Sequence, residues 1–188
     1  SRVASSILNA RAFRQIERQN RTLRTLTRLS QQLSSILELD ELLNAIATSV
    51  RGLINYDSFG IFLLDAERAV LRHKFSLRYD ERVNLDNIPL GSGITGNAAR
   101  DRQIIRVEDT QNDPRYIEVT RGIRSEISVP LIHKDKLVGI MDLESERVGF
   151  FTQEHEQTLT LLAPLIAQSL VNAKLYDEIA TTNERMEY

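Results

Sequence analysis

The stretch EISVPLIHKDKLVGIMDLE, residues 126–144, decides the fold. Two runs rich in apolar residues, 126–132 and 137–144, flank a polar turn at residues 133–136, and this pattern predicts an antiparallel hairpin. Alternation along the strands places one set of side chains on a single face, where we expect helices to pack: Ile127, Val129, Leu131, Leu137, Met141 and Leu143. The opposite face receives Glu126, Ser128, Asp142 and Glu144, together with Ile132, Val138 and Ile140.

Three carboxylates on the second face allow two interpretations. They can face water, which is usual for one side of an antiparallel sheet, or pair with Arg121 and Arg124. They can instead line a pocket if residues 90–122 fold back over them. Carboxylates that share a pocket repel one another, so such a pocket would favour a cationic or amine-bearing ligand.

Further strands are predicted upstream of the hairpin. Residues 58–64 (SFGIFLL) and 69–76 form a second pair, and residues 104–107 form a short strand. The glycine-rich turn 91–96 (GSGITG) opens a short helix around residues 97–100. Its letters satisfy the GxGxxG dinucleotide fingerprint, but the preceding NLDNIPL is a poor buried strand, so a tight turn is the preferred interpretation.

Helices are predicted at both ends of the chain. The first 36 residues contain no Gly or Pro, and their apolar residues recur at helical spacing, which predicts a long amphipathic helix. Asp40 is expected to cap a second helix, and Thr152 is expected to cap a final long helix that extends towards Tyr188. Asp113-Pro114 predicts one more helix start, because Asp is a good cap and Pro suits the first turn.

An internal repeat links the two terminal helices. Residues 3–20 (VASSILNARAFRQIERQN) align without gaps to residues 166–183 (IAQSLVNAKLYDEIATTN). The identical pairs are Ala4/Ala167, Ser6/Ser169, Asn9/Asn172, Ala10/Ala173, Ile16/Ile179 and Asn20/Asn183. Chance similarity between amphipathic helices is one explanation. The other is that residues 3–20 are the last helix of a preceding, similar domain, in which case they should be helical but pack little on this one.

Composition excludes several classes of function. The 188 residues carry 24 basic and 26 acidic side chains, a balance that argues against a nucleic-acid-binding surface. The chain has no cysteine, which excludes disulfides, thiol nucleophiles and thiolate metal sites. His73, His133 and His155 show no metal-ligand spacing and no GxSxG motif is present, so neither a metal site nor a cofactor is identifiable. No apolar run approaches a membrane span and no signal peptide is evident, so a cytoplasmic protein is expected.

The order of these motifs resembles that of a GAF domain, the small-molecule sensor module of signalling proteins. The resemblance covers residues 37–176 and is carried by DSFGIFLLD (57–65), IPLGSGITG (88–96), VED (107–109), DPRY (113–116), SEISVPL (125–131), GIMDLES (139–145), FT (151–152) and NAKLY (172–176). It implies an α+β fold with a mostly antiparallel sheet of about six strands. Long terminal helices would cover one face, and short helices and loops would roof a pocket on the other. Residues 1–36 would be a signalling or linker helix, and residues 177–188 an extension of the last helix.

Subfamilies of the GAF domain differ in details that can be compared with this sequence. Resemblance to the free methionine sulfoxide reductases implies acidic pocket residues like Glu126, Asp142 and Glu144, but those enzymes reduce their substrate with cysteines, which this chain lacks. Attachment of a bilin through cysteine is excluded for the same reason. Cyclic-nucleotide-binding members carry an Asn-Lys…Phe…Asp-Glu signature. Residues 145–154 read SERVGFFTQE and contain no Asn-Lys pair, so the sequence does not favour cyclic-nucleotide binding. A module without catalytic activity is therefore expected.

The resemblance implies the function of a regulatory sensor. Such a module binds a small molecule and passes a conformational signal through its terminal helices to an effector domain, such as a kinase, cyclase, phosphatase or transcriptional activator. The alternative is a ligand-free scaffold that dimerises and spaces flanking domains, and an enzyme is the least expected. The candidate ligand-binding residues are Thr95, Asp109, Tyr116, Glu126, Ser128, Asp142 and Glu144.

We also expect a parallel homodimer formed by the terminal helices, because a lone amphipathic helix leaves an apolar stripe in water. The candidate interface residues are Ile16, Leu23, Leu26, Leu33, Leu37, Leu159, Leu162 and Ile166. The other expected partner is the effector domain in the same polypeptide. Neither nucleic acid nor a membrane span is expected for this segment.

Overall fold

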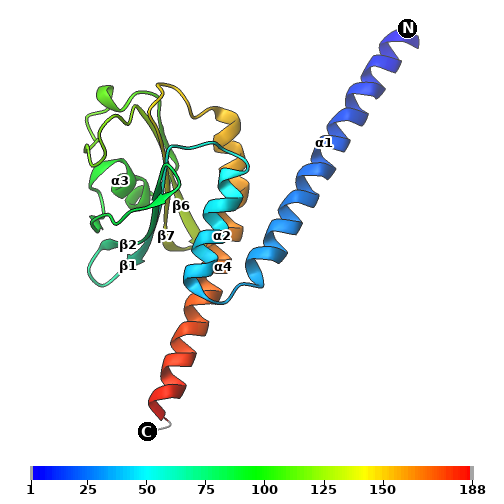
Figure 1. Cartoon of the computed structure of the whole chain (residues 1–188). Coiled ribbons are helices and arrows are strands. Elements are labelled where there is room, and N and C mark those ends of the chain that lie inside the picture. Colours follow the sequence, from blue (N-terminus) through cyan, green and yellow to red (C-terminus); the bar gives the residue numbers. More distant parts are fainter. Residues whose placement is uncertain (1, 187–188) are drawn as a thin grey trace.

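An antiparallel sheet forms the middle layer of the molecule (Figure 1). The computed structural model describes residues 2–186. The sheet has seven strands in the order β3-β2-β1-β7-β6-β5, with β4 paired to β2, where about six were expected. The strands are β1 (Ser58–Asp65), β2 (Val70–Arg78), β3 (Glu81–Arg82), β4 (Ile88–Pro89), β5 (Ile105–Val107), β6 (Ser125–His133) and β7 (Lys136–Ser145).

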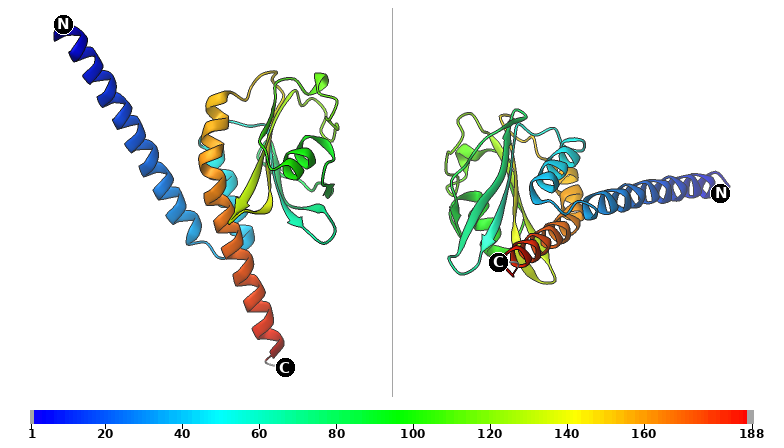
Figure 2. Two further views of the ribbon diagram at one scale, coloured as in Figure 1. Left: turned by 180° about the vertical axis from the view of Figure 1, so that it is seen from behind. Right: turned by 60° about the horizontal axis from the view of Figure 1, so that its bottom comes forward.

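Helices cover the two faces of the sheet differently. α2 (Leu39–Arg51) and α4 (Gln153–Met186) lie on one face, together with the C-terminal end of α1 (Arg2–Ser34). The short α3 (Gly93–Asp101) lies on the other face (Figures 1 and 2). A 3-10 helix, η1 (Thr110–Asn112), follows β5. This is the α+β arrangement that the resemblance implies.

The hairpin of β6 and β7 forms as the alternation predicts. Its turn residues Lys134 and Asp135 adopt positive φ angles of 48° and 62°, which suit the tight turns that join twisted strands. The register places Glu126 opposite Glu144 and Ser128 opposite Asp142. The other side of the hairpin faces the long helices and is fully buried, with Ile127, Val129, Leu131, Met141 and Leu143 in the main core.

Leu137 is an exception to the predicted alternation. The pairing of β6 with β7 shifts between Leu131 and Ile132, and a shift of one residue exchanges the two faces of a strand. Leu137 therefore packs with Ile140 in a second, smaller core on the side of α3, while Val138 packs against the main core.

The cap of α4 is predicted correctly, but the cap of α2 is not. Thr152 and His155 exchange hydrogen bonds at the start of α4, as expected for a capping residue. At α2, the Glu38 side chain accepts a hydrogen bond from the backbone N–H of Asp40, so Glu38 is the cap and Asp40 lies inside the first turn. A carboxylate at either position favours the helix N-terminus, which explains why the sequence alone did not separate them.

The second predicted helix start, at Asp113-Pro114, is wrong. The described chain has no helix at this point. The carboxylate of Asp113 instead accepts hydrogen bonds from both the backbone N–H and the guanidinium of Arg115. This local bonding stabilises a turn in place of a helix.

The glycine-rich turn holds α3 against β4. It follows the two-residue β4 and lacks the buried parallel strand that a dinucleotide site requires. Gly91 and Gly93 have φ angles of +84° and +65°, which favour glycine. Gly96 lies so close to Pro89 that a Cβ atom would come within 2.6 Å of the Pro89 carbonyl oxygen.

α1 leaves the domain at an angle, so its N-terminal half lies apart from the other elements (Figures 1 and 2). Residues 2–24 are exposed, whereas Leu29 and Leu33 are buried near the end of the helix. Residues 3–20 are therefore helical without packing on this domain.

The expected dimer interface requires correction. Leu33, Leu159, Leu162 and Ile166 are buried in the core of this same chain, so they are not available to a second copy. An amphipathic stripe looks the same whether it packs on the sheet and helices of its own chain or on a second copy. The remaining candidates are exposed or half-buried, namely Ile16, Leu23, Leu26 and Leu37, and dimer formation stays a prediction.

By length and composition alone, α4 is apolar enough to cross a membrane, but the core helices of soluble proteins pass the same test. Its inward side chains Leu159, Ile166 and Leu170 are buried in the main core. The helix is therefore weak evidence for a membrane span.

Two leucines of α1 should respond very differently to truncation. Leu33 is 2% exposed and Leu23 is 61% exposed. Leu33→Ala should lower the free energy of unfolding by about 2–5 kcal/mol because it leaves a cavity, whereas Leu23→Ala should change it by less than about 0.5 kcal/mol. Urea denaturation followed by circular dichroism measures both. An equal loss for Leu23→Ala would mean that another surface covers the exposed stripe.

Two glycines provide a matched test of how α3 is held. Gly96→Ala should cost about 1–3 kcal/mol of stability, because the new methyl group has no room beside Pro89. Gly52→Ala makes the same chemical change at a position with a φ angle of −63°, where the nearest atom would be 3.5 Å away. It should be neutral or slightly stabilising. Thermal unfolding of the two variants would contradict this account if they lost equal stability.

Candidate functional site

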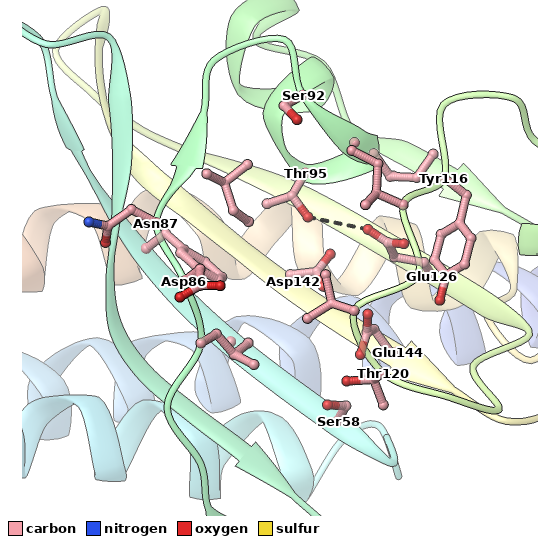
Figure 3. Close-up of a pocket in the computed structure, with 18 of the residues that line it drawn as sticks. Ser58, Asp86, Asn87, Ser92, Thr95, Tyr116, Thr120, Glu126, Asp142 and Glu144 are labelled. Carbon is pink, nitrogen blue, oxygen red and sulfur yellow. Dashed lines mark hydrogen bonds between the residues drawn. The ribbon is translucent and has the colours of Figure 1, made fainter.

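A cavity of about 210 Å³ lies on the face of the sheet opposite α2 and α4. Its floor comes from β1, β6 and β7, and its roof comes from α3, the segment around β4 and the loop after η1 (Figure 3). At about 10–15 Å³ for each water, this volume corresponds to roughly 14–21 waters, so the cavity has room for a ligand of about ten or more non-hydrogen atoms.

Three carboxylates lie together on the floor of this cavity. Glu126 on β6 stands opposite Glu144 on β7, and Asp142 precedes Glu144 by two residues on the same face. Glu126 and Asp142 are only 3% and 9% exposed, and Glu144 is half-buried. On the neighbouring strand, Gly60 stands opposite Asp142 and has no side chain that could cover it.

Hydroxyl groups hold two of the carboxylates in place. Thr95 on α3 donates a hydrogen bond of 3.3 Å to Glu126 Oε1, which ties the roof to the floor (Figure 3). The fully buried Ser128 lies 3.2 Å from the same Glu126 oxygen and also hydrogen-bonds to Asp142 Oδ1. A serine hydroxyl has one proton, so it satisfies only one carboxylate at a time as a donor.

The pKa values of all three carboxyl groups are raised. Burial raises the pKa of Glu126 well above its usual range, and repulsion from Asp142 and Glu144 adds to the shift. Burial raises the pKa of Asp142 to about 6, although a hydrogen bond from Ser128 opposes the change. Burial, followed by the charge of Asp142, raises the pKa of Glu144 to about 8. The carboxyl groups of this cluster therefore stay partly protonated near neutral pH. A bound positive charge would lower their pKa values and allow them to ionise.

Tyr116 offers an unused hydrogen-bonding group in the same cavity. Its hydroxyl oxygen is buried and has no hydrogen-bond partner among residues 2–186, and leaving such a group unsatisfied costs about 1–3 kcal/mol. Burial, followed by the nearby charges of Glu144 and Glu126, raises the pKa of Tyr116, so the hydroxyl keeps its proton. A ligand or a water molecule in the cavity would supply the missing partner.

The rest of the lining is largely apolar, and the part that the structure describes contains no Lys, Arg or His. Its apolar members include Leu85, Ile88, Ile94, Ile117 and Val119. Arg124, which one of the two interpretations of the sequence paired with these carboxylates, instead pairs with Asp109 at 2.9 Å. Within the described residues, no group of three or more His, Cys, Asp or Glu side chains could hold a metal ion.

Most of the predicted ligand-binding residues come together in the structure. Those that line the cavity are Thr95, Tyr116, Glu126, Asp142 and Glu144. Ser128 does not line it but contacts two of the carboxylates. Asp109 lies elsewhere, because its carboxylate caps η1 and binds the guanidinium of Arg124.

Sequence reasoning missed five polar lining residues, Ser58, Asp86, Asn87, Ser92 and Thr120. Ser58 could have been found, because it pairs with Glu144 across the sheet and shares a face with Gly60 by alternation. Asp86 and Thr120 lie in irregular segments without a periodic pattern. Only the folding of these segments over the sheet brings them to the cavity.

Several known proteins are similar to this chain. The free methionine-R-sulfoxide reductase of Escherichia coli (strain K12) is 30% identical over 132 residues, which make up 70% of this chain and 77% of the relative. An X-ray structure of the free methionine-R-sulfoxide reductase from Neisseria meningitidis, in complex with its substrate, gives a TM-score of 0.72 at 21% identity and covers 82% of this chain and 90% of that chain. The GAF domain of a phosphoenolpyruvate-protein phosphotransferase from Acinetobacter gives a TM-score of 0.70 at 21% identity, with coverage of 84% and 97%.

These relatives contradict one expectation from the sequence. A module without catalytic activity was predicted, but two of the three relatives are reductases and hence enzymes. The prediction of the fold is confirmed, since a family model for the GAF domain matches residues 36–171. This chain therefore belongs to the GAF domain family.

Proposed function

We propose that the cavity binds a small molecule with a protonated amino group, of the size of a free amino acid, and that the chain is a ligand-responsive module. The observation that carries the proposal is the group of three carboxylates, Glu126, Asp142 and Glu144, in a cavity whose described lining has no cation. A protonated amine has three hydrogen-bond donors and carries the charge that would allow these groups to ionise.

Two further features favour an amino acid over other amines. The apolar lining residues suit an apolar side chain, and the Tyr116 hydroxyl is available to a polar group on the ligand. The substrate for which the E. coli relative is named, free methionine-R-sulfoxide, combines such parts with an amine. It is therefore the first ligand to test.

Reduction of a bound sulfoxide is a separate question from binding. The chain has no cysteine, so reduction here would use no thiol of this chain. Binding and turnover can be measured on the same sample.

β7 connects the cavity with the long helices. Asp142 faces the cavity, whereas Met141 and Leu143 on either side of it pack in the core with residues of α4. A change in the charge of Asp142 therefore acts one residue away from the packing of α4. After Ala173 this helix continues with exposed side chains to Met186. We take it as the path by which ligand binding reaches an effector domain in the same polypeptide.

Removal of one pocket carboxylate should weaken binding. Isothermal titration calorimetry with L-methionine-R-sulfoxide should show at least a tenfold loss of affinity for Asp142→Asn, because a charge-assisted hydrogen bond contributes about 1.5–3 kcal/mol. Asp109→Asn is the matched control, since it removes a carboxylate that lies outside the cavity, and its affinity should equal that of the wild type.

The ligand series distinguishes the proposal from its alternatives. An analogue without the amino group should bind at least tenfold more weakly than the amino acid. Equal affinity for the two, or affinity unchanged by Asp142→Asn, would contradict the proposal. A complete lack of binding by amino acids and other amines would favour the ligand-free scaffold. Release of methionine from the sulfoxide, followed in the same samples, would show turnover.

The raised pKa values predict that the ligand-free protein becomes less stable as the pH rises. A carboxyl group with a higher pKa in the folded chain stabilises the fold below its unfolded pKa, near 4, and this contribution is lost as the pH rises through the folded value. The folded pKa values are about 6 for Asp142 and about 8 for Glu144. The Tm should therefore fall between about pH 5 and about pH 8.

The Glu144→Gln variant should show a shallower fall of the Tm over this range, because it removes one of the titrating groups. Glu154→Gln, at an exposed position on α4, is the control and should keep the wild-type slope. Scanning calorimetry at several pH values measures all three proteins. A wild-type Tm that rises across this range, or equal slopes for the two variants, would show that the pocket carboxyls do not titrate as described.

A further inference from the structure

We infer that the face of α1 formed by Val3, Ala4, Ile7 and Ala10 is the core-facing side of the last helix of a second GAF-like domain, which precedes this one in the same polypeptide. The surface that covers this face is then the apolar side of that domain's sheet. The inference rests on how the repeated segment packs at its other position, in α4.

The residues of the repeat that are buried in α4 have identical or similar counterparts in α1. In residues 166–183, the buried side chains are Ile166, Ala167, Ser169, Leu170 and Ala173. With the constant offset of the repeat, the corresponding residues of α1 are Val3, Ala4, Ser6, Ile7 and Ala10. Three of these pairs are identical and the other two exchange one aliphatic side chain for another. Conservative matching at every buried position indicates the same kind of surface opposite both helices.

The two serines of the repeat also make the same hydrogen bond. Ser169 Oγ donates to the carbonyl of Leu165, and Ser6 Oγ donates to the carbonyl of Arg2. Each hydrogen bond is 3.0 Å long. In α4 this bond satisfies a hydroxyl that is buried in the core. Ser6 is therefore already in the conformation that burial requires.

The same positions differ sharply in exposure. Ile166 and Leu170 are 1% and 0% exposed, because α4 packs on β6 and β7. Val3 and Ile7 are 69% and 49% exposed, on the part of α1 that extends away from the domain (Figure 2). Because its side chains are exposed, this face of α1 is accessible to another domain.

A second copy of α1 suits this face less well than a sheet does. A coiled-coil seam needs apolar side chains every three or four residues over several turns. The line from Val3 through Ile7 and Ala10 continues to Arg14 and Glu17, so the apolar seam stops after about two turns. The alanines and serine of the repeat permit the close approach to a sheet that α4 makes with β6.

The test uses the polypeptide encoded by the complete gene, with scanning calorimetry as the readout. Ile7→Asp should lower the Tm of a second unfolding transition by about 5 °C or more, because it places a charge in the core of the preceding domain. Phe13→Asp is the matched control. Phe13 is also exposed in α1, but its counterpart Tyr176 is exposed on α4, so the substitution should leave both transitions unchanged.

The 188-residue chain on its own provides the comparison. Here neither substitution should change the Tm or the sedimentation coefficient, because the covering domain is missing. A dimer of this chain that Ile7→Asp dissociates would assign the face to a second copy and overturn the inference. The inference would also be overturned if the complete polypeptide had no GAF-like domain before residue 3, or if Ile7→Asp had no larger effect on the Tm than Phe13→Asp.

Discussion

The pairing of β6 with β7 is the constraint on which the rest of the structure depends. This register sets Glu126 directly opposite Glu144, and two carboxylates across a strand pair destabilise a sheet by up to about 1 kcal/mol when both are ionised. On the other face the same register buries Ile127, Val129, Met141 and Leu143, each of which stabilises the fold by about 1.5–3 kcal/mol. A slip of one residue would exchange the faces, so the apolar side chains fix the register. The carboxylates are held together because the core on the opposite side does not allow them to separate.

Membership of the GAF family defines the fold of this chain, whereas the chemistry of the cavity bears on its function. A reductase and the GAF domain of a phosphotransferase have nearly equal TM-scores against this chain, 0.72 and 0.70, so the fold alone does not define a function. The side chains at the cavity carry the distinction: three carboxylates with raised pKa values, a tyrosine hydroxyl without a partner among the described residues, and a sequence without cysteine. These features are the basis of the proposal that the cavity binds a positively charged ligand.

Local patterns predicted the parts of this molecule that depend on neighbouring residues in the sequence. Alternation was enough to place Glu126, Asp142 and Glu144 on one face, and the Thr152 cap depends only on its own helix turn. The errors arise where distant segments meet. A shift in strand pairing moved Leu137 to the other core, and the main core of this chain buries four leucine and isoleucine side chains that were assigned to a dimer. Asp109 pairs with Arg124, which lies fifteen residues further along the chain. No periodic pattern in the sequence reveals such a contact. The absence of cysteine led to an expectation of no catalysis, which the relationship to reductases contradicts.

The strands at the two edges of the sheet are very short, since β3 and β4 beside β2 have two residues each and β5 has three. Long open edges offer unpaired backbone groups to any neighbouring chain and so invite aggregation. Domains of one fold that are joined in a polypeptide hold one another's strands at a high effective concentration, where exchange of strands is a common failure of folding. Edges of two and three residues leave little backbone for a foreign strand to pair with. Such a sheet can be repeated along a chain, connected by continuous helices, with each copy folding on its own strands.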